Sequence, residues 1–304
     1  MRFEGVMPAI TTPFKKDLSI DYEFVAKHVT WLVKHGCTGI VPLGSLGEGN
    51  TLRFEEKVAV VETCVEALEG RAPVMPGISA LSTAEAVELA RSCAAAGCDG
   101  LMVLPPYVHN GQMHETRAHF GAIFEATDLP CMLYNNPIAY GTDVTPPIMS
   151  ELAARYENMK AVKESSGDIR RVTAVKALLD DRLAVFAGLD DMPYEAAWSG
   201  ADGWIAGLVN ALPAESVALF SLAKQGRRDE AFEIYRWFLP LLRMDTVPEF
   251  VQLIKLVQVE VGMGVETVRP PRQRLPEAER EAALGLIRQC LSSRPTLEVG
   301  QEVS

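Results

Sequence analysis

The sequence has no long apolar run and no excess of positive charge. It contains no stretch of about 18 uninterrupted apolar residues, and its start, MRFEGVMPAI, has no positively charged segment leading into such a run. The formal net charge is -11, whereas nucleic acids and anionic membrane surfaces attract clustered Lys and Arg. We therefore expect a cytoplasmic protein that binds neither nucleic acid nor a membrane.

The sequence also lacks the cysteine and histidine spacings of metal sites. Its six cysteines show no CxxC pair, and most lie in apolar stretches where a thiol behaves as a small hydrophobic group. His109, His114 and His119 are five residues apart, which turns successive rings by about 140° around a helix. We expect buried thiols, solvated histidines and no bound metal.

What the sequence does contain is a repeated alternation of short apolar runs with amphipathic segments, a pattern typical of βα units with a parallel sheet. The expected strands are the eight runs at 6–14, 39–44, 72–79, 100–106, 130–137, 159–165, 183–190 and 203–210. Segments between them, such as 54–68 and 83–96, have apolar residues at helical spacing, and Ser82 can cap the second of these. The pattern predicts a (β/α)₈ TIM barrel over residues 1–212.

Residues 213–304 are mostly helical in pattern, which is more than one closing helix of a barrel requires. Breaks are expected at Gly226, Pro240, Pro248 and 269–276. The sequence therefore predicts a C-terminal helical extension packed on the barrel, with a flexible tail from about Ser293.

Catalytic groups of such barrels lie where the strands end, which directs attention to the residues that close each run. The sixth run closes with KESSGD (163–168), which begins with Lys163. A lysine there is commonly a solvated loop residue. At the mouth of a barrel, however, partial desolvation favours the uncharged amine, which attacks carbonyl carbons.

The fifth run closes with YNNP (134–137), which places Tyr134 one strand away from the lysine. A core tyrosine with a satisfied hydroxyl is one interpretation, and a phenol that carries protons for carbinolamine formation and dehydration is the other. The second run ends with the glycine-rich turn 44–48, which is either a tight loop or a cradle whose N–H groups and Ser45 hydroxyl bind a carboxylate.

With GxxGE at 44–48, YNxP at 134–137 and Lys163 in this order, the chain resembles the dihydrodipicolinate synthase and N-acetylneuraminate lyase family of class I aldolases over about residues 5–292. The resemblance implies a Schiff base between Lys163 and a small 2-keto acid or cyclic imine carboxylate, without metal or organic cofactor. It also implies a homotetramer. It assigns these further roles: Tyr134 as proton carrier, Ser45 and the Leu46 backbone as carboxylate cradle, and Gly188 and Ile205 as lining of the keto-acid pocket.

Other motifs resemble a particular branch of this family. The synthase that names the family has an arginine after YNxPS for its second substrate's carboxylate, whereas this chain has Ile138 and Ala139. The motifs DVTP (143–146), KESSGDIRR (163–171), FAGLDD (186–191), GWIAG (203–207) and RPPR (269–272) resemble the bacterial 1-pyrroline-4-hydroxy-2-carboxylate deaminases.

The resemblance thus implies conversion of 1-pyrroline-4-hydroxy-2-carboxylate to 2,5-dioxopentanoate and ammonia in hydroxyproline degradation. Alternatives are a 2-keto-3-deoxy sugar-acid dehydratase or aldolase, dihydrodipicolinate synthase, and a non-catalytic ligand-binding relative. Because no cation follows Pro137, we expect little condensation of pyruvate with aspartate semialdehyde. Asp190 and Asp191 are expected to cap the following barrel helix and to take no part in catalysis.

Overall fold

The protein, described here from a computed structural model that covers residues 3–106, 108–109 and 111–297, is built on parallel strands. Within these residues seven strands form one sheet in the order β1-β7-β6-β5-β4-β3-β2. The strands are β1 (Gly5–Pro8), β2 (Gly77–Ile78), β3 (Leu101–Val103), β4 (Cys131–Asn135), β5 (Met159–Glu164), β6 (Ala184–Ala187) and β7 (Gly203–Ala206).

The second predicted run, residues 39–44, fills the gap between β1 and β2. Isolated parallel bridges join Ala9 to Val41 and Ile40 to Val74. A regular ladder does not form there because Pro42 and Pro73 have no N–H to donate. The backbone thus closes into the predicted (β/α)₈ TIM barrel, with one of its eight strands held by single bridges.

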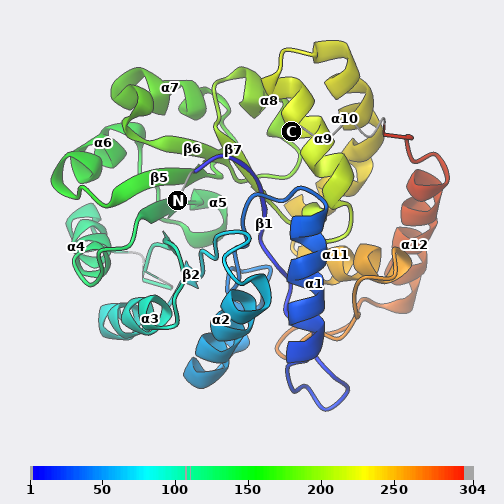
Figure 1. The fold of residues 1–304 in the computed structure, drawn as a ribbon, viewed down its shortest axis with the longest axis horizontal. Helices are drawn as coiled ribbons and strands as arrows, with labels where there is room; N and C mark the ends of the chain where they lie inside the picture. The colour runs from blue at the N-terminus through cyan, green and yellow to red at the C-terminus, as the bar shows by residue number, and fades with distance from the viewer. Residues whose placement is uncertain (1–2, 107, 110, 298–304) are drawn as a thin grey trace.

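Helices surround the strands (Figure 1). They are α1 (Tyr22–Lys34), α2 (Phe54–Leu68), α3 (Thr83–Ala95), α4 (Met113–Phe124), α6 (Pro146–Arg155), α7 (Arg170–Leu179), α8 (Pro193–Trp198) and α9 (Pro213–Lys224), with the one-turn α5 (Pro137–Tyr140) projecting onto the middle of the ring. Ser82 caps α3 as predicted, since its side chain accepts a hydrogen bond from the Glu85 N–H at 3.2 Å. No helix in the described ranges is both long and apolar enough to cross a membrane.

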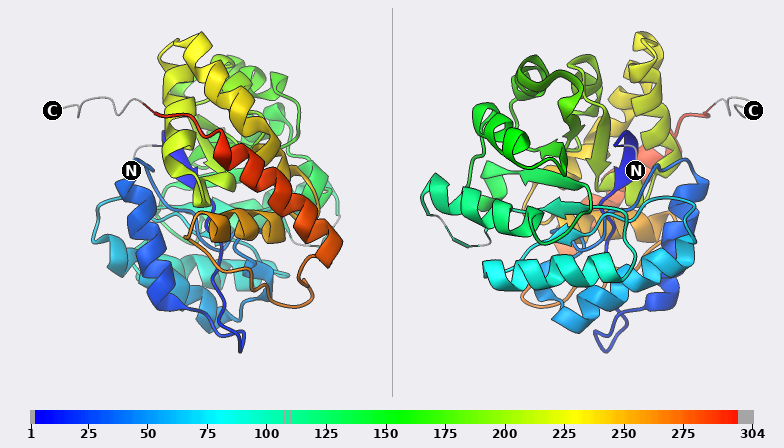
Figure 2. Two further views of the ribbon diagram at one scale, coloured as in Figure 1. Left: turned by 90° about the vertical axis from the view of Figure 1, so that its right-hand side faces the viewer. Right: turned by 60° about the vertical axis from the view of Figure 1, so that its left-hand side comes forward.

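The predicted C-terminal helices are α10 (Arg228–Leu242), α11 (Phe250–Glu260) and α12 (Glu277–Ser292). Figure 2 shows α12 lying across α10 on the outside of the molecule. Pro240 does not break α10, because it lies in the last turn and only two helical residues follow it. Residues 298–304, most of the predicted tail, lie outside the described residues.

Candidate active site

A hollow of about 540 Å³ opens where the strands end and where the C-terminal region reaches the barrel. All six residues singled out from the sequence contribute to its lining: Ser45, Leu46, Tyr134, Lys163, Gly188 and Ile205. Its size is within the usual range for a small-molecule site. Asp245 and Arg272 complete the wall on the C-terminal side.

Lys163 and Tyr134 lie side by side because β5 and β4 are parallel neighbours that pair these two residues in register. The Lys163 Nζ atom lies 4.2 Å from the centre of the Tyr134 ring. Their side chains are almost covered, with exposed fractions of 5% and 6%. This geometry places a primary amine against the ring of a phenol, and both side chains are largely shielded from water.

Gly188 follows β6 and leaves room for the lysine. A Cβ atom at this position would lie 2.9 Å from Lys163 Cε and 1.9 Å from Ser165 Oγ. Any side chain here would therefore push the lysine out of its position. Ile205, on β7, is buried and supplies apolar surface to the same hollow.

The glycine-rich turn that carries Ser45 and Leu46 is tied to the C-terminal region. Glu48 adopts a left-handed conformation with φ of 53° and is fully buried. It accepts a hydrogen bond from Lys255 Nζ at 2.6 Å and another from the Arg269 backbone N–H at 2.9 Å. Breaking this buried pair would leave an unpaired charge in the interior, which costs free energy. These contacts therefore hold the turn in place.

The YNNP motif (134–137) positions side chains on the side of the barrel mouth that faces the glycine-rich turn. Asn136 Nδ2 donates to the Tyr134 hydroxyl at 3.0 Å, and Asn136 Oδ1 accepts from the Ala139 N–H that begins α5. With Pro137 in the first turn, this is a well-capped helix start. One asparagine therefore holds the phenol and also sets the direction of α5.

Two charged residues of the lining were not predicted as site residues. Asp245 belongs to the short 3₁₀ turn η4 (Arg243–Thr246), and Arg272 follows the two prolines of the RPPR motif. Neither lies near a strand end in sequence, so the rule that catalytic groups follow strands does not find them. The RPPR motif was a signal for Arg272, but its position in the chain gave no indication of what it faces.

Two carboxyl groups lie near Lys163, the fully buried Asp190 and the partly exposed Asp245. Burial raises the pKa of Asp190 to about 6, against the lowering effect of hydrogen bonds from backbone N–H groups and of the nearby Lys163. The pKa of Asp245 is also raised, first by burial and then by the charge of Asp190. The negative charge of Asp190 thus opposes ionisation of the Asp245 carboxyl group.

Asp190 does not cap α8, which corrects the prediction made for it. Its carboxylate accepts hydrogen bonds from the N–H groups of Gly207, at 3.0 Å, and Leu208, at 2.7 Å, after β7. Helix α8 begins only at Pro193. The side chain turns towards the neighbouring strand because the two free N–H groups at the start of η3 (Leu208–Asn210) lie within its reach.

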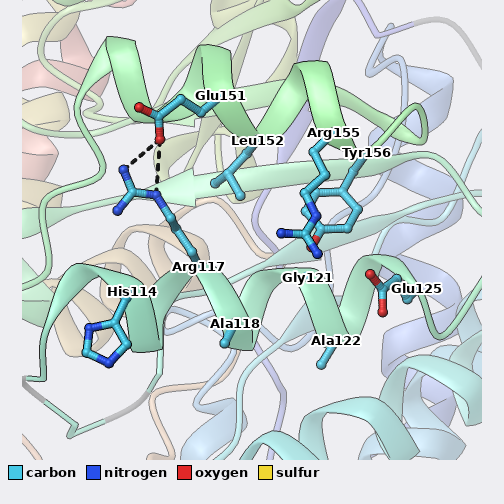
Figure 3. A pocket seen from close by; sticks show the side chains of 10 residues that line it. All are labelled: His114, Arg117, Ala118, Gly121, Ala122, Glu125, Glu151, Leu152, Arg155 and Tyr156. Atoms are coloured by element: carbon cyan, nitrogen blue, oxygen red, sulfur yellow. Dashed lines mark hydrogen bonds and ion pairs between the residues drawn. The ribbon is translucent and has the colours of Figure 1, made fainter.

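A second hollow, of about 550 Å³, lies on the outside of the barrel between α4 and α6 (Figure 3). Within the described residues, one ion pair lies in this hollow, between Arg117 and Glu151 at 2.6 Å. Neither Lys163 nor Tyr134 lines it. The residues predicted for carbonyl chemistry therefore lie only in the hollow at the barrel mouth, among these two hollows.

The chain is similar in sequence to enzymes that carry one name. The 4-hydroxy-tetrahydrodipicolinate synthase of Methanoculleus marisnigri is 35% identical over 285 residues, covering 92% of this chain and 96% of the relative. The enzyme of the same name from Methanosphaerula palustris is 34% identical over 288 residues, covering 93% and 97%.

Solved structures give the same result. Dihydrodipicolinate synthase from Aquifex aeolicus is 28% identical and superimposes with a TM-score of 0.90, covering 94% of this chain and 98% of that chain. A prophage protein of the same family from E. coli K12, determined in complex with pyruvate, is 28% identical with a TM-score of 0.90, covering 95% and 99%. The similarity extends over the barrel and the C-terminal helices together.

These relatives contradict the predicted deaminase activity and its place in hydroxyproline degradation, since they are named as synthases. The structure gives a physical reason for the error. Asp143, from the DVTP motif, forms a two-bond ion pair with Arg171, and Arg269, from RPPR, pairs with Glu56. Parts of the motifs taken as marks of a substrate thus serve to hold the fold.

The model of the Dihydrodipicolinate synthetase family matches residues 2–290, which is nearly the whole chain. The family is one of lyases, so the expectation of an enzyme is supported at this level. The chain belongs to the Dihydrodipicolinate synthetase family.

Proposed function

We propose that this enzyme joins pyruvate, or a closely similar 2-keto acid, to an aldehyde that bears a carboxylate, as in the reaction of 4-hydroxy-tetrahydrodipicolinate synthase. The observation that carries the proposal is the shielded Lys163 amine, 4.2 Å from the Tyr134 ring at the base of the pocket. The names of the relatives agree with it, and one solved structure of the family was determined with pyruvate.

In this proposal Lys163 Nζ attacks the keto carbon of pyruvate. Loss of water from the carbinolamine gives an iminium ion, which withdraws electrons from the adjacent methyl group. Removal of a methyl proton then gives an enamine, and its carbon attacks the aldehyde carbon while the aldehyde oxygen takes up a proton. Tyr134 carries protons in these steps, and hydrolysis of the final iminium restores the free lysine.

In this proposal, residues of the barrel wall bind the keto acid. Ser45 and the Leu46 N–H bind its carboxylate, because a hydroxyl and a backbone donor of a tight turn suit an anion. Gly188 and Ile205 leave a small, partly apolar space for the methyl group. This chemistry needs only the covalent bond to Lys163, and we propose no metal or organic cofactor for it.

In this proposal, the wall formed by the C-terminal region binds the aldehyde. Ile138 and Ala139 carry no charge, but Arg272 enters the same pocket from the C-terminal region. Among the described residues no acidic side chain pairs with Arg272, whose guanidinium lies 5.9 Å from the Phe250 ring centre. A guanidinium is well suited to bind a carboxylate. In this proposal Arg272 supplies the cation that the positions after Pro137 do not carry.

The proposal is tested by incubating the purified protein with pyruvate and aspartate semialdehyde and following pyruvate consumption and the cyclic product by mass spectrometry. Acetaldehyde, which has no carboxylate, is the matched control substrate. We expect condensation with aspartate semialdehyde and much slower reaction with acetaldehyde. Absence of any pyruvate consumption with carboxylate-bearing aldehydes would contradict the proposal.

We further propose that the protein is a homotetramer of the cytoplasm. Apolar side chains at Leu81, Val108 and Ile138 are exposed in loops that follow strands or on the adjoining α5, and such surface is often covered by a second copy. Light scattering during gel filtration should give four times the chain mass of 33.2 kDa. A monomer mass at micromolar concentration would contradict this arrangement.

A further inference from the structure

Glu48 lies between the two walls of the pocket and is bound to both. Its backbone N–H donates to the Ser45 carbonyl oxygen at 3.1 Å within the glycine-rich turn. Its carboxylate accepts a hydrogen bond from the Arg269 N–H at 2.9 Å, and the Arg269 carbonyl oxygen in turn accepts one from the Arg272 N–H at 3.2 Å. One residue thus connects Ser45 on the barrel side with Arg272 on the C-terminal side, and both of these line the pocket.

The other carboxylate oxygen of Glu48 is bound by Lys255 of α11. Lys255 Nζ lies 2.6 Å from Glu48 Oε1 and 2.7 Å from the Thr267 carbonyl oxygen, and the two charged side chains are 1% and 0% exposed. Phe14 packs beside the pair, with its ring centre 4.7 Å from Nζ. Burial lowers the pKa of Lys255, and the charge of Glu48 opposes this lowering. The ammonium thus binds the glycine-rich turn and also the segment that leads to Arg269.

The glycine-rich turn leaves Glu48 little freedom to move alone. A Cβ atom at Gly49 would lie 2.3 Å from the Leu43 carbonyl oxygen, so the backbone is packed tightly on itself at this point. The Gly49 N–H also donates to the Gly44 carbonyl oxygen at 3.3 Å, which closes the turn around Glu48. A displacement of the Glu48 carboxylate is therefore transmitted to Ser45 rather than absorbed by the turn.

We propose that Glu48 and Lys255 are a positioning pair that holds the two substrate subsites at a fixed separation, an inference that rests on the proposed function. Neither side chain lines the pocket, so neither contacts a substrate. They act through Ser45, which in that function binds the carboxylate of the keto acid, and through Arg272, which binds the carboxylate of the aldehyde. Loss of the pair therefore weakens the binding of both substrates, whereas loss of one wall residue weakens the binding of one.

The first test is Lys255→Met, which keeps the length of the side chain and removes its charge. Borohydride trapping gives the pyruvate concentration that half-saturates adduct formation, and steady-state kinetics give the KM for aspartate semialdehyde. We expect both concentrations to rise by roughly 10–100-fold, because a displacement of about 1 Å at a binding group can cost about 10²-fold. The rate of trapping at saturating pyruvate should change little, since Lys163 is held by the sheet.

The matched control is Lys57→Met on α2. The Lys57 side chain is also buried, at 7% exposed, and its Nζ lies 3.7 Å from Glu85, but neither residue lines the pocket. Its loss should lower the midpoint of thermal unfolding without raising either concentration. Partial unfolding reduces the amount of active enzyme, whereas a half-saturating concentration does not depend on that amount.

The second test is the double variant of Lys255→Met and Glu48→Gln, which leaves no unpaired charge in the interior. Replacing both partners of a buried ion pair is often neutral for stability, whereas removing one partner is strongly destabilising. We expect the double variant to unfold at a higher temperature than Lys255→Met, while both half-saturating concentrations stay raised. Stability and positioning are thereby measured separately.

Wild-type half-saturating concentrations in the double variant would show that the pair only stabilises the fold, and would overturn this inference. Equal increases in Lys57→Met and Lys255→Met, or an increase for only one of the two substrates, would overturn it as well. Failure of the wild-type protein to form a pyruvate adduct or to consume aspartate semialdehyde would instead contradict the proposed function, and this inference with it.

Discussion

The two walls of the pocket are built in different ways. On the barrel side, Lys163 and Tyr134 are paired in register on adjacent strands and are almost fully buried. On the C-terminal side, Asp245 lies in a single 3₁₀ turn and Arg272 in a loop, and both groups are partly exposed. The wall that carries the proposed Schiff-base lysine is thus part of the sheet, whereas the wall proposed to bind the second substrate is not.

In the proposed function this difference separates the residues that react from the residues that select the second substrate. A sheet whose hydrogen bonds and packing are continuous holds reacting groups within small tolerances. Loops accept substitutions at lower cost to the fold, so the choice of second substrate can change there without disturbing the lysine. We therefore expect changes in the barrel wall to abolish the chemistry and changes in the C-terminal wall to alter affinity and specificity.

The largest expected effect is that of Lys163→Ala, which removes the attacking amine. Turnover should fall to background while the fold persists, because one side chain at the mouth contributes little core packing. The matched control is Lys160→Ala, an exposed lysine on the same strand, which should leave the rate unchanged. Turnover and the midpoint of thermal unfolding are measured for both. Substantial activity in Lys163→Ala would end the Schiff-base account.

Next in size is Tyr134→Phe, which keeps the aromatic face near Lys163 Nζ but loses the hydroxyl bound by Asn136. We expect kcat to fall by about 10²–10⁴ because one positioned proton carrier is lost. The KM for pyruvate should change little. Steady-state kinetics distinguish the two parameters, and an unchanged kcat would remove Tyr134 from the chemistry.

A smaller effect is expected for Arg272→Gln on the C-terminal wall. Losing a charge-assisted contact should raise the KM for aspartate semialdehyde by roughly 10–150-fold, whereas trapping of pyruvate should be unaffected. Arg274→Gln provides the control, since Arg274 is an exposed residue of the same loop that lies 3.8 Å from Glu266. Equal KM values for wild type and Arg272→Gln would contradict the division of roles between the walls.

The smallest effect concerns stability. The pKa of Asp245 is raised in the folded protein by burial and by Asp190, so the folded state binds more protons than the unfolded state above about pH 4. Stability is therefore lost as the pH rises through this window, and Asp245→Asn should remove the loss. Thermal unfolding should show the variant to be more stable by a few degrees at about pH 8 and equal to wild type near pH 4. A variant less stable at about pH 8 would show that the Asp245 carboxylate stabilises the fold.

Much of the barrel could be predicted from the sequence because its signals are local. Apolar periodicity predicted a helix at 54–68, where α2 lies, and the Ser82 hydroxyl predicted the start of α3. The run at 39–44 was recognised as a strand although prolines reduce its pairing to single bridges. Lys163 and Tyr134 could be placed together because parallel strands end at the same edge.

The rest of the site depends on contacts between segments that lie far apart in sequence. Arg272 reaches the pocket because Arg269 is bound to Glu48 and Glu56, which no local pattern reveals. Tyr140 meets Ser45 only because Asn136 directs α5 across the mouth. RPPR thus combines a residue that holds these segments in place, Arg269, with one that lines the pocket, Arg272.

The most direct test of the central claim is borohydride reduction in the presence of pyruvate, followed by proteolysis and mass spectrometry of the peptides. The account predicts a reduced pyruvate adduct on the peptide that contains Lys163, with Lys160 of the same strand unmodified, and no adduct in Lys163→Ala. An adduct confined to another lysine, or no adduct in the wild-type protein, would contradict it.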